Sequence, residues 1–334
     1  MRLRERIVAA LFWVLCLQGL GRPQSALPKE DALRPGVVPL VPVTPGPSVS
    51  SDNMAIPEGG VLAGGSYRND YFGFSYRLPR GWEQVFEGPP PSDTGHYVLA
   101  EFSHMDERTG SSQGSILITA YDEFFAPREG DSPKHLIDAL KARLGPVYQL
   151  EDPPAEVRLA NRSFVRLNYQ APAAELHWRI LAAQMRCHIV EFIFTSRDVK
   201  LLDALVQRMD GMQMAAVSAS GPNDKGEDDV PICIRNYATG PNLVHEVDPG
   251  FAGPKFTNIP TRIVIDKNGK VKQVHVISAF PAQAESVKAA LAQWEFKPYV
   301  EGGHPREVET GLMFEFPPRE QKSRIQAPNN ASRY

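Results

Sequence analysis

The chain has 334 residues, of which 42% are hydrophobic and 22% are charged, and its formal net charge at pH 7 is −3. This composition is ordinary for a globular protein, and the length leaves room for two domains. A slightly acidic chain without a basic stripe does not fit a nucleic-acid binder, so we predict no nucleic-acid partner.

The first residues have the layout of a secretory signal peptide. MRLRER is a basic start, residues 7–21 form an apolar run, and small residues follow at Ser25 and Ala26. A membrane-spanning helix needs about 20 apolar residues, and this run is shorter. We therefore expect cleavage near Ala26 and export to the periplasm or cell envelope. The alternative is an uncleaved inner-membrane anchor, and only then do we expect contact with a membrane.

Composition divides the chain into parts. Prolines crowd the segment after the apolar run, and a small, polar and acidic segment separates two regions with regular apolar patterns. Segments of both kinds are typical of linkers. The predicted parts are a signal peptide at 1–26, a Pro-rich linker at 27–65, an α+β domain at 66–214, a linker at 215–230, a small domain at 231–316 and a disordered tail at 317–334.

The first predicted domain contains strands and two helices. Ser132-Pro133 predicts one helix start, with Ser132 as N-cap, and Thr195-x-x-Asp198 predicts the other by its likeness to a capping box. This order favours an antiparallel sheet packed with helices in an α/β sandwich. The predicted strands are 73–78, 97–103, 115–121, 163–170, 177–185 and 187–195.

Two passages of this domain resemble a known family. YRNDYFGFSYRLPRGWEQV at Tyr67–Val85 is similar to the opening of PsbP-like domains, and HIVEFIFTSRDVKLLDALVQRM fits their end. The resemblance implies an exported, noncatalytic adaptor or accessory domain.

One motif in this domain is formally catalytic. Residues 110–114 read GSSQG and match G-x-S-x-G, which would make Ser112 a nucleophile. A nucleophile elbow needs a strand, a sharp turn and a helix, whereas this motif lies between two predicted strands. We therefore predict a hairpin loop, no catalytic residue and no enzyme activity, and we keep a hydrolase using Ser112 as an alternative.

The cysteines left after cleavage are Cys187 and Cys233. Export would permit a disulfide between them. However, Cys187 lies in a predicted core strand and Cys233 in a different segment. We therefore expect two buried free thiols. The sequence has no H-E-x-x-H and no C-x-x-C motif, so we predict no metal site and no cofactor.

The small domain has the clearest pattern in the chain. Two apolar strands flank Asn268-Gly269, a hairpin signal in which both central residues need positive φ. A helix with one apolar face follows, with Ala284, Val287, Leu291 and Trp294 on that face. The last strand then alternates, with Val308, Thr310, Leu312, Phe314 and Phe316 on its inward side. The predicted order is β-β-α-β.

This domain resembles the C-terminal domain of TonB, the energy-transducing protein of the bacterial envelope. The resemblance rests on three elements: Asp266-x-x-Gly269-x-Val271, Trp294-x-Phe296-x-Pro298 and the Gly302-Gly303 turn. In that family the last strand receives a short box peptide of outer-membrane receptors. The resemblance thus implies a protein partner, such as an outer-membrane receptor segment, at the last strand. The residues concerned are Val308, Glu309, Thr310, Gly311, Leu312, Met313, Phe314, Glu315 and Phe316.

Two interpretations of this last strand stay open. Its outward face carries Glu307, Glu309, Gly311, Met313 and Glu315, and acids on an edge strand keep an ordinary edge soluble. Alternatively, an extended partner segment pairs with the exposed backbone. We expect an exported, noncatalytic envelope protein that binds a protein partner here. The alternatives are an energy transducer anchored by residues 1–26, the Ser112 hydrolase, or a periplasmic scaffolding protein; no oligomeric state is favoured.

Overall fold

The structure is a computed structural model, and it describes residues 49–50, 55–86, 95–105, 112–125, 132–214, 230–250, 258–315 and 324–326. The predicted signal peptide, most of the two linkers and most of the tail lie outside the described residues. Residues 40–332 form one compact unit. Within it, we call residues 55–214 the first domain and residues 230–315 the C-terminal module.

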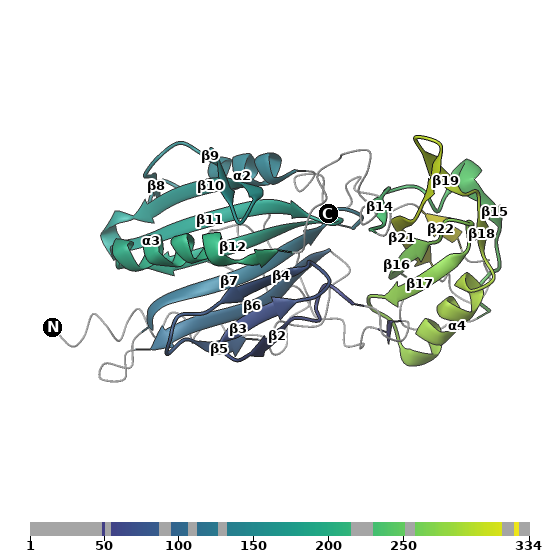
Figure 1. Cartoon of the computed structure of the whole chain (residues 1–334), viewed down its shortest axis with the longest axis horizontal. Helices are drawn as coiled ribbons and strands as arrows, with labels where there is room; N and C mark the ends of the chain where they lie inside the picture. The colour runs from purple at the N-terminus through teal and green to yellow at the C-terminus, as the bar shows by residue number, and fades with distance from the viewer. Residues whose placement is uncertain are drawn as a thin grey trace, which may run out of the picture. The chain divides into compact units, whose positions relative to one another are not determined.

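The first domain is built on an eight-stranded antiparallel sheet in the order β5-β6-β7-β12-β11-β10-β8, with β9 beside β10 (Figure 1). Its strands are β5 (Glu83–Phe86), β6 (His96–Met105), β7 (Ser112–Asp122), β8 (Gln149–Leu150), β9 (Ala155–Leu159), β10 (Arg162–Ala171), β11 (Leu176–Met185) and β12 (His188–Ser196). A second, four-stranded antiparallel sheet contains β2 (Val61–Ala63), β3 (Ser66–Asn69), β4 (Phe74–Arg77) and β13 (Gln213–Met214).

Helices cover both faces of the large sheet. Helix α2 (Pro133–Ala142) buries Leu136, Ile137 and Leu140 against one face. Helix α3 (Val199–Gln207) and the small sheet cover the other face, where Leu202 and Leu205 meet the rings of both sheets. Short 3-10 helices lie at Pro172–Ala174, Arg208–Gly211 and Gly240–Asn242.

The predicted strands and helices of this domain are present, but the predicted start of one helix is wrong. All six predicted strands exist, and Ser132 caps α2 by accepting a hydrogen bond from His135 N at 3.1 Å. The N-cap of α3 is Asp198, which accepts from Lys200 N at 2.9 Å, and not Thr195. Thr195 is still part of β12, because it pairs with Ser115 and Trp178 on both neighbouring strands.

The C-terminal module is a sheet with one helix. Its sheet has the order β1-β17-β16-β21-β14, with β22 also paired to β21. The strands are β1 (Val49–Ser50), β14 (Ile232–Cys233), β16 (Asn258–Ile265), β17 (Val271–Val276), β21 (Val308–Glu315) and β22 (Arg324–Gln326). Two short pairs join β15 (Leu243–His245) to β18 (Glu295–Phe296) and β19 (Tyr299–Glu301) to β20 (His304–Arg306). Figure 1 shows α4 (Pro281–Leu291) alongside this sheet.

The core of the module confirms the predicted helix face and strand alternation. Ala284, Val287, Leu291 and Trp294 are all 0% exposed and pack with Leu312 and Phe314. The α+β class and the β-β-α-β order are thus confirmed, although the first domain has two sheets rather than one. The strands β1 and β22 lie within the predicted linker and tail, whose boundaries remain proposals.

The Asn268-Gly269 turn differs from the prediction. Gly269 has φ +83°, but Asn268 is not among the described residues with positive φ. Asp266 organises the turn, because its Oδ1 accepts from Asn268 N at 2.9 Å and Lys270 N at 2.8 Å. Gly269 also accepts a hydrogen bond from Phe296 N at 2.8 Å, so this turn is fixed by β18 as well as by its own sequence.

Candidate functional site

The predicted partner strand is β21, and it has neighbours on both sides. Its residues from Val308 to Glu315 pair antiparallel with β16. On its other side, β14 pairs with Val308 and Glu309, and β22 pairs with Met313, Phe314 and Glu315. We call this second side the outer edge. Phe316, the last predicted site residue, lies outside the described residues.

Hydrogen bonds show which backbone groups face the outer edge. The carbonyls of Glu307 and Glu309 accept from Ile232 N at 2.8 Å and from Ile234 N at 3.0 Å. Because backbone groups alternate along a strand, the amides of Gly311 and Met313 face the same way. The outer edge therefore pairs with strands of either direction, since β14 is parallel and β22 is antiparallel to β21.

The face of β21 opposite α4 is covered rather than solvated. Glu309 and Gly311 are buried, and Met313 is partly buried. A Cβ added at Gly311 would lie 2.6 Å from Phe124 Cβ, so the first domain packs directly on the strand. These residues do face away from the module's core, as predicted, but they meet the first domain. The interpretation of Glu309 as a solubilising acid is therefore wrong.

Glu309 is held by three side chains. It is 0% exposed, and its Oε1 accepts from Arg262 Nη1 at 2.6 Å and from Tyr71 Oη at 2.7 Å. Its Oε2 accepts from Arg186 Nη2 at 3.1 Å. Burial acts to raise the pKa of Glu309, but Arg262 and Arg186 outweigh it and lower the pKa below its usual value. The carboxylate is therefore ionised inside the protein.

Arg262 of β16 is the centre of this buried network. Its Nε donates to Asp122 Oδ2 at 3.0 Å, and its Nη1 donates to Tyr71 Oη at 2.8 Å. Arg262 and Asp122 are both 0% exposed, so each charge depends on the other for compensation. Burial raises the pKa of Asp122, although Arg262 opposes the shift. Burial and the charge of Arg262 both lower the pKa of the neighbouring His188, which keeps that imidazole neutral.

A disulfide lies beside the network. Cys187 and Cys233 are bonded, with 5.5 Å between their Cα atoms, so the prediction of two free thiols is wrong. Cys187 is in the turn between β11 and β12, not in a strand, and Cys233 is the last residue of β14. The pairing of β14 with β21 brings Cys233 to the apolar cluster around Cys187, which contains Phe124, Phe125 and Ile277.

The sequence analysis missed the residues of this network. Arg262 stands in the apolar run TRIVI, and Asp122 ends the apolar run SILITAYD. A charged residue in a buried strand needs a partner, so each position could have been flagged as a paired charge. The partner could not have been named, because 140 residues separate the two.

Ser112 does not lie on a nucleophile elbow. It is the first residue of β7, and its Oγ donates to the carbonyl of Gly114 at 3.0 Å. Strand β7 follows directly, where an elbow would have a helix. The motif therefore lacks the geometry that its five-residue pattern would need.

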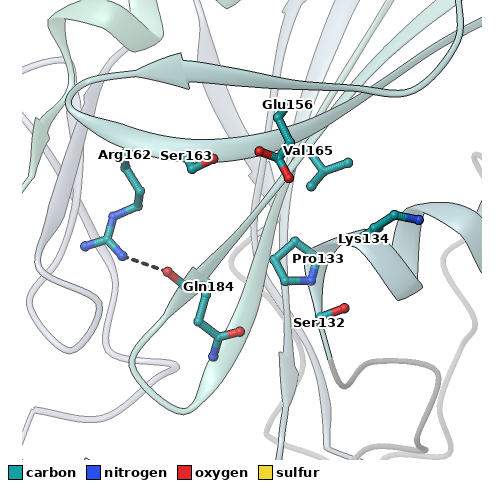
Figure 2. A pocket seen from close by; sticks show the side chains of 8 residues that line it. All are labelled: Ser132, Pro133, Lys134, Glu156, Arg162, Ser163, Val165 and Gln184. Carbon is teal, nitrogen blue, oxygen red and sulfur yellow. Dashed lines mark hydrogen bonds between the residues drawn. The ribbon is translucent and has the colours of Figure 1, made fainter.

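A pocket of about 330 Å³ lies at the start of α2 (Figure 2). Arg162 donates to the backbone carbonyl of Gln184 at 2.7 Å, and Lys134 pairs with Asp138 at 2.6 Å. Glu156 places a negative charge in the same pocket. The charges that line this pocket are thus of both signs. Its lining residues are Ser132, Pro133, Lys134, Glu156, Arg162, Ser163, Val165 and Gln184.

Among the described residues, no group of acidic, histidine or cysteine side chains is arranged to hold a metal ion. Within the same residues, every helix is too short or too polar to cross a bilayer.

Comparison with known proteins matches one family. Residues 258–318 match the family of the Gram-negative bacterial TonB protein C-terminal. The match includes all of β16, β17, α4 and β21. The comparison with curated proteins found no match.

Two solved structures are similar to parts of the chain. One is cyanobacterial PsbP (CyanoP) from Synechocystis sp. PCC 6803, with 15% identity and a TM-score of 0.32, over 47% of this chain and 98% of that one. The other is LpqN of Mycobacterium tuberculosis, which is involved in cell envelope biogenesis, with 9% identity and a TM-score of 0.29, over 43% of this chain and 83% of that one.

Proposed function

We propose that this chain is an exported, noncatalytic protein of the bacterial cell envelope that binds an extended segment of a partner protein at the outer edge of β21. The match of residues 258–318 to the TonB C-terminal family supports an envelope setting and a protein partner. A receptor segment from the outer membrane is the partner class that this family suggests.

One observation carries the proposal. The chain's own segment Arg324–Gln326 already pairs with Met313–Glu315 as an added antiparallel strand. This edge can therefore pair with a strand that is not part of the module's core. Backbone hydrogen bonds supply much of the affinity in strand addition, so a partner segment of suitable length can replace β22.

A pull-down from envelope extract tests the proposal. Proline at Met313 removes the outward backbone donor and the Met313 contact with the cluster around Phe124, but it leaves the inward core residues Leu312 and Phe314 in place. We expect Met313→Pro to lose at least nine tenths of the bound partners. Val244→Pro, at a 61% exposed position of β15, is the matched control and should keep them. A folded Met313→Pro chain that captures every wild-type partner would rule out strand addition at this edge.

Export has its own test. The intact mass of the chain purified from native cells should correspond to a start after Ala26. A mass that retains Met1, in protein that stays in the membrane after a carbonate wash, would favour the anchored energy transducer instead.

A further inference from the structure

The outer edge of β21 is divided between two short strands. Strand β14 pairs with Val308 and Glu309, and β22 pairs with Met313–Glu315. Among the described residues, no strand pairs with Thr310–Leu312 on this side. A partner that replaces β22 can therefore extend its pairing only as far as β14.

Strand β14 is attached to the first domain by a covalent bond. It has two paired residues, and the second, Cys233, forms the disulfide with Cys187. Cys187 is 0% exposed in the turn between β11 and β12. After Ile234 the chain turns, with Tyr237 N donating to the carbonyl of Ile234 at 3.3 Å, and the carbonyl of Arg235 accepts from Thr310 Oγ1 of β21 at 3.1 Å. Ile234 and the residues after it are also held by the module's core, but Ile232 and Cys233 have only this short pairing, and the disulfide is the one covalent bond that keeps them beside β21.

We infer that the Cys187–Cys233 disulfide sets the length of the strand-addition site, an inference that rests on the proposed function. The partner is an extended polypeptide segment that runs antiparallel to β21, as β22 does. It pairs with Thr310–Glu315 and stops at β14. Without the disulfide, β14 leaves the edge and the site lengthens to the whole of Val308–Glu315.

Peptides derived from β22 provide a probe of this length. In the observed register Arg324 lies opposite Glu315 and Gln326 lies opposite Met313. A fluorescent peptide RIQAVT would then reach Thr310, and RIQAVTVT would reach Val308. The full chain carries Ile325→Pro in every arm, so that its own tail does not compete. Binding is measured by fluorescence anisotropy for the disulfide-bonded chain and for the Cys187→Ser/Cys233→Ser variant, with folding checked by circular dichroism.

We expect the two peptides to bind the disulfide-bonded chain with affinities within twofold of each other. In the serine variant, the longer peptide should bind at least tenfold more tightly than the shorter one. If the longer peptide bound the disulfide-bonded chain tenfold more tightly than the shorter one, the inference would be overturned, even if the serine variant did not fold. Equal affinities in a folded serine variant would also overturn it. If neither peptide binds either chain, the proposed strand addition at β21 is contradicted as well. If the peptides bind but their relative affinities differ from those expected, only the role of the disulfide is contradicted.

Discussion

Arg262 of β16 and Asp122 of β7 form a fully buried ion pair at 3.0 Å between residues that are 140 positions apart. Arg262 also contacts Glu309 of β21 at 2.6 Å. One guanidinium thus joins the first domain to the strand that we propose as the binding edge. The position of that edge depends on the first domain as well as on the module's own core.

Replacing Arg262 should be strongly destabilising. Arg262→Met leaves Asp122 and Glu309 buried without their main cation, and breaking a buried pair in this way costs about 3–5 kcal/mol. Urea denaturation measures the loss. The matched control is Lys272→Met on the same sheet, whose pair with Glu307 at 2.7 Å is half exposed on the lysine side and should contribute at most about 1 kcal/mol.

A rescue variant separates charge from packing. Adding Asp122→Asn and Glu309→Gln to Arg262→Met removes the buried charges and should restore part of the stability. If the triple variant is less stable than Arg262→Met alone, then Arg262 does not stabilise the protein by compensating these buried charges.

Gly269 should tolerate no side chain. It has φ +83°, and an added Cβ would lie 1.9 Å from the carbonyl oxygen of Phe296. Gly269→Ala therefore needs both a strained backbone and a shift of β18, and we expect a loss of about 3 kcal/mol in the free energy of unfolding. Gly303→Ala is the control, because Gly303 has φ +85° with open space around it, and about 1 kcal/mol is expected there. Equal losses at the two positions would contradict the role of β18.

The raised pKa of Glu191 should make the free energy of unfolding depend on pH. It is buried, its Oε2 accepts from Thr119 Oγ1 at 3.0 Å, and burial raises its pKa to about 7. Because the pKa is higher in the folded chain, the stability from this group is full below the unfolded pKa of about 4.5 and is lost as pH rises through 7. Between pH 5 and pH 8, this group should lower the free energy of unfolding of the wild type by about 2–3 kcal/mol. In Glu191→Gln that part of the fall should be absent, which urea denaturation at several pH values would measure. A pH profile that is unchanged in Glu191→Gln would contradict the assignment.

Ser112 should be dispensable for any chemistry. Its Oγ is hydrogen-bonded to Gly114 of its own strand, and no helix follows the motif. In an esterase and peptidase screen, the wild type and Ser112→Ala should give the same result. Activity that Ser112→Ala abolishes would support the hydrolase alternative.

Local patterns could be predicted from the sequence because their causes are local. The face of α4 follows from the spacing of Ala284, Val287 and Leu291, and the inward face of β21 follows from its alternation. The N-cap of α3 was misplaced because cross-strand pairing keeps Thr195 in β12. The sequence offered Cys187 and Cys233 as a possible pair, but it could not show that the pairing of β14 with β21 brings them together. The partners of Arg262 depend on contacts between distant segments, about which single-sequence patterns carry no information.

Hydrogen exchange resolved to single amides tests the binding edge most directly. It would be measured on the full chain, free and bound to a partner recovered in the pull-down. The account predicts at least tenfold slower exchange at the outward amide of Gly311 on binding, because that amide lies on the part of the outer edge that neither β14 nor β22 pairs. The amide of Leu312, which faces β16, should not change. Unchanged exchange at Gly311, with new protection confined to another surface, would contradict strand addition at β21.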